Sequence, residues 1–226
     1  MPARAPIDTP QTGAANGALV RAGLVVSAQS LAWTVAGSTA AVAIGIVNGS
    51  GALVAFGAVG VVDAIGSAGL VYHFRHALRH EEISSALEAV VHRVVLAGLV
   101  TVGLSTVVVD TVRLIAGGHG RASSFGTGLA AVSLVVLGLL SARKARIARR
   151  IPSAALRADG HLSAVGACLA AITLAGTAAT QAFAWDWADA AAAIFVGAVA
   201  VMLGVASWLG ERRLRRRLRA AIGADG

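Results

Sequence analysis

The sequence predicts an all-α membrane protein, a bundle of six transmembrane helices with both termini in the cytoplasm. Three observations lead to this fold class. Of the 226 residues, 57% are hydrophobic and only 13% are charged, and the mean hydropathy is +0.76, well above that of an ordinary soluble domain. Six apolar runs reach or approach the roughly 20 residues that a helix needs to cross the hydrocarbon core. Positive charge gathers in the connections on one side.

The six predicted spans alternate with short polar connections. An alternative of four or five spans would leave two of the runs on the membrane surface, but none has the basic polar stripe of an interfacial helix. Six crossings therefore describe the pattern better than four or five. The predicted spans are Leu19–Val47, Ala52–Tyr72, Ala89–Val109, Phe125–Leu140, Ser163–Phe183 and Ala188–Leu209.

The distribution of arginine and lysine predicts the orientation. Basic residues are frequent in the segments His73–Glu82 and Ala142–Arg157 and in the final string ERRLRRRLR, whereas the opposite connections carry only Arg113 and Arg121. The positive-inside bias then places both termini in the cytoplasm. We expect a flexible cytoplasmic tail over residues 1–18, a transmembrane domain over 19–210 and a basic cytoplasmic tail over 211–226. That last tail is either a simple anchor or a site that recognises anionic lipid.

Composition and motifs exclude several classes of function. The net charge of +8 does not indicate nucleic-acid binding, because the basic residues lie at the ends of apolar runs and only one tyrosine is available for stacking. Cys168 is the only cysteine, so one chain can form neither an internal disulfide nor a multi-cysteine metal site. We expect no enzymatic activity and no prosthetic group, since the chain has no phosphate loop, nucleophile elbow or HExxH string.

Few ionisable residues lie where they could act inside the membrane, and each is a candidate because burial in lipid is costly. Asp63 is deep in the second span, while Asp159 and His161 stand at the start of the fifth. If these two helices are neighbours, the oxygen and nitrogen donors of Asp63, Asp159 and His161 suit a divalent ion such as zinc, manganese, iron or cobalt.

Each candidate has an alternative that the sequence leaves open. Asp63 can be a protonated or hydrogen-bonded buried carboxyl, Asp159 can cap the fifth helix, and His161 can be a polar residue at headgroup level.

Other polar residues near the ends of the spans have two or more interpretations. If the second helix continues, His73, His76 and His80 fall on one of its faces, where they form either a metal site or an interfacial turn. Asp110 and Arg113 are expected to form a pair at the membrane rim, where the third span ends. Asp186 lies between Trp185 and Trp187, and Asp189 follows them. This string predicts an interfacial belt followed by a cap of the sixth helix.

Glycine and alanine are dense within the spans, as in the second span and in the alanine run that opens the sixth. Helices in lipid associate through close backbone contact, for which small side chains are suited. The sequence therefore predicts a compact bundle that is able to form a homo-oligomer.

Two strings resemble the cation diffusion facilitator (cation efflux) family. GSGALVAFGAVGVVD covers Gly49–Asp63, and SAALRADGHLSAVGACLA covers Ser153–Ala170. The second string carries the family's A-D-(A/G) signature at the start of the fifth helix. Together with six spans and the basic fourth-to-fifth connection, the resemblance covers residues 20–210. It describes a short form that lacks the C-terminal cytoplasmic domain and has an altered metal site.

The resemblance implies four metal ligands, two on the second helix and two on the fifth, each pair four residues apart. Asp63 matches the later position of the first pair, but Val59 stands at the earlier one. On the fifth helix an ungapped match places Leu162 and Gly166 at the ligand positions, and a one-residue gap restores His161 but leaves Val165. Two of the four ligands are therefore expected here, with Asp159 or a second chain able to add another.

The function implied by the resemblance is efflux of divalent metal cations, such as zinc, by exchange with protons. Such an antiporter is expected as a homodimer in the plasma membrane of a bacterial-type cell, held mainly within the bilayer, with a divalent metal ion and the lipid bilayer as its partners. The alternative is a non-transporting membrane protein of the same fold, a sensor or subunit, that has lost the metal site.

Overall fold

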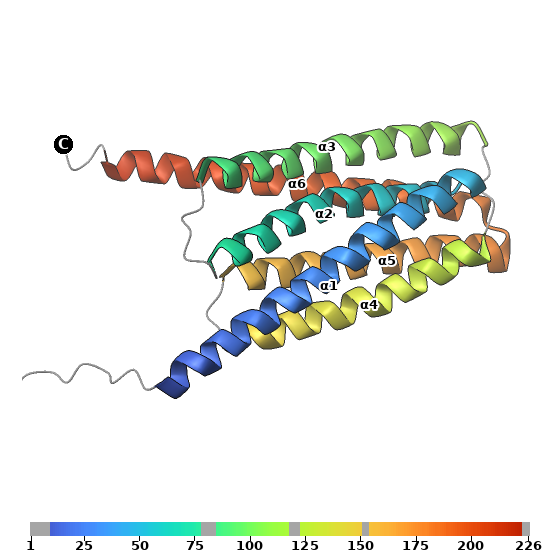
Figure 1. Cartoon of the computed structure of the whole chain (residues 1–226). Coiled ribbons are helices and arrows are strands. Elements are labelled where there is room, and N and C mark those ends of the chain that lie inside the picture. The colour runs from blue at the N-terminus through green and yellow to red at the C-terminus, as the bar shows by residue number, and fades with distance from the viewer. Residues whose placement is uncertain (1–9, 78–84, 118–122, 151–153, 223–226) are drawn as a thin grey trace, which may run out of the picture.

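The computed structural model describes residues 10–77, 85–117, 123–150 and 154–222. In this part of the chain every long element is an α-helix (Figure 1). The six helices are α1 (Pro10–Asn48), α2 (Gly51–Ala77), α3 (Ser85–Ile115), α4 (Ser124–Arg150), α5 (Ala154–Phe183) and α6 (Asp186–Ile222).

Each of the six helices contains a stretch that is long and apolar enough to cross a membrane, which confirms the predicted number of spans. These stretches are Arg21–Asn48, Gly51–Gly69, Arg93–Ile115, Ser124–Arg149, Gly160–Phe183 and Asp186–Gly210. Helical structure also reaches into both predicted tails, because α1 already begins at Pro10 and α6 continues to Ile222. The start of α1 and the end of α6 lie at the same end of the bundle (Figure 1).

Helix α2 occupies the centre of the bundle and contacts α1, α3, α5 and α6. Its apolar stretch is 56% buried, more than that of any other helix. The closest pairs are α4 with α5, α1 with α2 and α3 with α6. The contact between α2 and α5 is the one on which the sequence-based metal site depends.

Small residues allow these helices to approach closely, as the composition predicts. A Cβ atom at Gly103 on α3 would lie 2.6 Å from the carbonyl oxygen of Gly197 on α6, and one at Gly197 would lie 2.8 Å from the carbonyl oxygen of Gly103. Neither position has room for a side chain. Van der Waals contact between backbones therefore replaces the hydrophobic driving force that is weak between helices in lipid.

The α1–α2 turn depends on a glycine in the left-handed region. Gly49 has φ +66°, and the N–H of Ser50 donates to the carbonyl of Gly45 over 2.9 Å, a common way to end a helix. Ser50 then caps α2, since its Oγ accepts a 3.2 Å hydrogen bond from the N–H of Leu53. This turn brings α2 back along α1 with its first residues facing α3 and α6.

Candidate functional site

A cavity of about 630 Å³ lies within the bundle, and all six helices contribute to its wall. It occupies the half of the membrane-spanning region nearer the start of α1 and the end of α6. Helices α3 and α5 line it with residues from the beginning of their apolar stretches, such as Val95 and His161, and α6 lines it with Leu203 and Ser207 near the end of its own. His161, Leu162 and Ser207 are exposed, so this rim is not sealed.

Asp63 and His161 both line this cavity, the first from α2 and the second from α5. Asp63 lies twelve residues after Gly51 in a stretch that ends at Gly69, and it is half-buried. His161 is exposed in the first turn of the apolar stretch of α5. The helix packing thus brings two of the three sequence-predicted site residues to the wall of one cavity.

Asp159 belongs to α5, but its side chain falls outside the described part. The position of its backbone in the helix still tests whether Asp159 caps α5. Because α5 begins at Ala154, Asp159 lies in the second turn of the helix and not at its N-cap. The capping role considered from the sequence is therefore wrong.

The positions that the family resemblance assigns to metal ligands all belong to the cavity wall. Val59 and Asp63 line it from α2, and Leu162 and Gly166, or His161 and Val165 with the one-residue gap, line it from α5. The spacing of four residues places each pair on one helix face. Among the described residues no group of three or more His, Cys, Asp or Glu side chains comes together to hold a metal ion.

A buried lysine lies next to this wall, which sequence reasoning missed. Lys144 on α4 is 0% exposed, and its Nζ donates hydrogen bonds of 2.8 Å to Ser30 Oγ on α1 and 2.8 Å to Ser163 Oγ on α5. Ser163 itself lines the cavity. The Nζ atom of Lys144 therefore lies behind Ser163, between α1, α4 and α5.

The sequence did contain a signal for this lysine. Counted among the basic residues of a connection, Lys144 looked like one more orienting charge. Helix α4, however, continues to Arg150, and its buried residues recur every three or four positions, at Ser133, Leu137, Leu140, Lys144 and Ala148. This helical period extends the buried face through the basic run.

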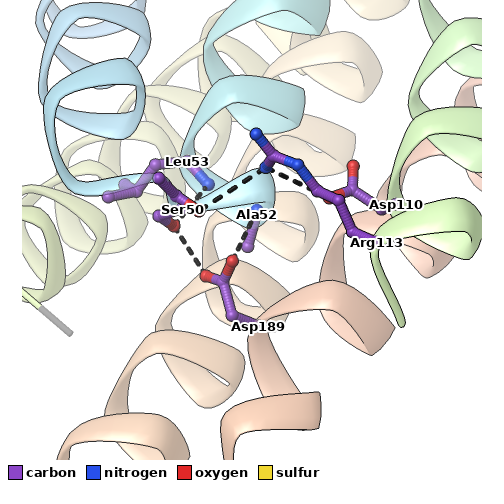
Figure 2. A network of polar contacts seen from close by, with 7 residues as sticks. Ser50, Ala52, Leu53, Asp110, Arg113 and Asp189 are labelled. Carbon is purple, nitrogen blue, oxygen red and sulfur yellow. Dashed lines mark hydrogen bonds and ion pairs between the residues drawn. The ribbon is translucent and has the colours of Figure 1, made fainter. Parts of the chain in front are cut away.

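A second polar cluster closes the opposite end of the bundle (Figure 2). Ser50 Oγ donates to Asp189 Oδ1 over 2.6 Å, and the N–H of Ala52 donates to Asp189 Oδ2 over 3.4 Å. Asp189 is 5% exposed. The sequence predicts an interfacial belt followed by an N-cap of the sixth helix at residues 185–189. Asp189 lies in the first turn of α6 and reaches from there to the positive N-terminus of α2.

Asp110 and Arg113 of α3 belong to the same cluster. Arg113 Nη1 lies 3.7 Å from Asp110 Oδ1, which confirms the predicted pair, and donates a 3.5 Å hydrogen bond to the carbonyl of Gly49. The Asp110 carboxylate also contacts the position where Gly51 lacks a side chain. The cluster thus joins the α1–α2 turn to α3 and α6.

Of the other residues that the sequence singles out, some lie within the described part of the chain and some lie outside it. Trp185 and Trp187 are exposed, and their rings stack with centroids 5.8 Å apart. Helix α2 continues through His73 and His76 to Ala77, as the proposed histidine face requires. The side chains of His73 and His76, and the whole of His80, lie outside the described residues.

Comparison with known proteins adds no relative to this description. The chain matches no protein-family model, and no curated protein matches it at a significant level. The likeness to the cation diffusion facilitator family therefore stays a prediction from the two quoted strings.

Proposed function

We propose that this protein is a secondary transporter of the cation efflux type, which exports divalent metal cations in exchange for protons. The observation that carries the proposal is the meeting of Asp63 and His161 in one cavity inside the membrane-spanning region. Ionisable side chains in such a region are costly, and they commonly mark ion pathways. The quoted likeness to the cation diffusion facilitator family names the cargo.

The two ends of the bundle fit an alternating-access cycle. The cavity has an exposed rim at the end where α1 begins, and the cluster of Ser50, Asp189, Asp110 and Arg113 closes the other end. With the termini in the cytoplasm, an ion would enter from inside, meet the carboxylate and the imidazole, and leave outward when the cluster opens. Water or Asp159 would complete the coordination, since zinc prefers four donors.

In this proposal the protein acts in the plasma membrane of a bacterial-type cell as a homodimer, and it catalyses no reaction. Its dimer would form between helix faces within the bilayer. The many large apolar side chains that point away from the bundle, such as Val108, Val112 and Phe195, are compatible with either lipid or a second copy as neighbour.

A second candidate is a membrane protein of the same fold that senses or assembles but does not transport. Val59 favours it, because this residue stands in the cavity wall where the resemblance expects a metal ligand. Two donors with water bind zinc much more weakly than four.

Uptake of zinc, cobalt and manganese into sealed proteoliposomes under a proton gradient separates the candidates. The transporter predicts uptake of at least one of these ions, with strong loss for Asp63→Ala and His161→Ala and no loss for Asp186→Ala, an exposed carboxylate on α6. Rates equal to wild type in both cavity variants would disprove the site. No uptake of any ion by the unaltered protein would favour the non-transporting candidate.

A further inference from the structure

The size of the cavity does not match a metal ion alone. Its volume of about 630 Å³ falls within the roughly 300–1,000 Å³ that is typical of sites for small organic molecules. Most of its wall is apolar, including Phe56 on α2, Leu99 on α3 and Leu137 on α4. A bare ion would leave this apolar wall in contact with water, whereas an organic body would displace that water with a gain in free energy.

Polar groups converge on this apolar wall at a few points. Asp63 supplies a carboxylate from α2, and Trp33 supplies an aromatic ring from α1. Ser133 on α4 is 1% exposed, lines the cavity, and its Oγ has no hydrogen-bond partner within the described residues. Because a buried hydroxyl without a partner is costly, Ser133 points to a ligand with a polar atom in this space.

The charged residues of the wall indicate whether that ligand is a cation or an anion. Among the described residues that line the wall, Asp63 is the only aspartate or glutamate, and none is a lysine or an arginine. Lys144 does not line the wall, and its Nζ donates to the hydroxyls of Ser30 and Ser163. A carboxylate and an aromatic ring in the wall of one cavity suit a cation, the first through direct attraction and the second through the face of the ring.

We propose that the cavity binds an organic monocation with an apolar body, with its charge at Asp63 and its body against Phe56, Leu99 and Leu137. This inference shares Asp63 with the proposed function but does not need metal transport. The same cavity would then accept two kinds of cation. An organic cation would also compete with a divalent ion for the carboxylate.

Binding of tetraphenylphosphonium to the purified full chain in lipid nanodiscs tests the proposal. Tetraphenylborate has the same shape and the opposite charge, and it serves as the control ligand. We expect saturable binding of the cation to wild type and about tenfold or greater weakening in Asp63→Asn, as for the loss of a charged partner. Binding that is tighter for the anion than for the cation would overturn the proposal.

A second pair of variants tests the location without removing the carboxylate. A Cβ atom at Gly37 on α1 would lie 3.7 Å from Trp33 and 3.9 Å from Ser133 Oγ, both in the cavity wall. Gly37→Leu should fill the cavity and abolish binding. Gly128→Leu adds the same side chain where nothing lies within 4 Å and should leave affinity unchanged. Equal affinity in both variants would place the cation in the lipid and overturn the proposal.

The two proposals fail separately. If zinc moves but the phosphonium does not bind, this inference is wrong and the proposed function stands. If the phosphonium binds in an Asp63-dependent way and no divalent ion moves, the inference stands and metal transport is wrong.

Discussion

The Nζ atom of Lys144 on α4 donates a 2.8 Å hydrogen bond to the hydroxyl of Ser163 on α5, two residues after His161. Next to this contact, Ser141 Oγ donates to the carbonyl of Gly160 over 3.0 Å. A Cβ atom at Gly160 would lie 3.4 Å from the Cβ of Lys144. Two hydrogen bonds and this close approach therefore hold α4 against the part of α5 that carries His161, and this side of the cavity depends on a buried lysine.

Replacing Lys144 with alanine should destabilise the protein. The change removes a fully buried side chain and the donor to Ser30 and Ser163, so we expect a loss of about 2–5 kcal/mol from the void and the two lost hydrogen bonds together. Chemical unfolding in detergent, followed by circular dichroism, measures it. Arg143→Ala is the matched control, because the neighbouring Arg143 is exposed on the same helix and should change stability by about 0.5 kcal/mol or less. Equal effects of the two variants would contradict the role given to Lys144.

The Ser50–Asp189 cluster at the other end of the bundle predicts a similar contrast in stability between variants of two aspartates of α6. Asp189→Ala removes the acceptor of Ser50 Oγ and of the Ala52 N–H, and we expect it to cost about 1.5–3 kcal/mol, as for hydrogen bonds to a charged group. Asp186→Ala, in the same first turn but exposed, should cost less than about 1 kcal/mol. The same unfolding measurement applies. A larger loss for Asp186→Ala than for Asp189→Ala would contradict the network.

The α3–α6 contact predicts opposite signs for two glycine substitutions. Gly103→Ala places a Cβ atom 2.6 Å from the carbonyl oxygen of Gly197, so the helices must separate, at a cost of about 1–3 kcal/mol. Gly138→Ala on α4 meets nothing within 4 Å and should stabilise by up to about 1 kcal/mol through helix propensity. Thermal unfolding of both variants in the same detergent tests this. Stabilisation by Gly103→Ala would mean that the two helices are further apart than described.

The missing ligand of the resemblance can be restored. Val59 lines the cavity four residues before Asp63 on α2, so Val59→His would place an imidazole and a carboxylate on one helix face. We expect zinc affinity, measured by calorimetry, to rise about tenfold or more. Val61→His is the control, because residue 61 is 43% exposed on the outside of the bundle. Equal gains in both variants would show that residue 59 does not face the ion.

Much of the fold could be predicted from the sequence, because a membrane demands long apolar helices and leaves them visible as runs. Asp63 and His161 also stood out, since ionisable residues are rare inside such runs. Their meeting in one cavity depends on α2 packing against α5, and hydropathy does not encode which helices are neighbours. The contact of Asp189 with α2 was missed for the same reason, because its partner Ser50 is 139 residues away in the sequence.

The burial of Lys144 was missed because two sequence patterns overlap at this residue. Lys144 belongs both to a basic run that indicates orientation and to a helix face that is buried. A count of charges detects only the first pattern. The packing of α1 and α5 around its Nζ atom is seen only in the assembled bundle.

The most direct test of the account is the accessibility of residue 63 from the side of the bundle where α1 begins. Cys168 is the only cysteine and is exposed, so Cys168→Ser provides a cysteine-free background into which Asp63→Cys is introduced. A membrane-impermeant methanethiosulfonate reagent added on that side should label residue 63, and Val61→Cys on the outer face of the same helix should remain unlabelled in lipid. Labelling of Val61→Cys but not of Asp63→Cys would contradict the cavity on which both proposals depend.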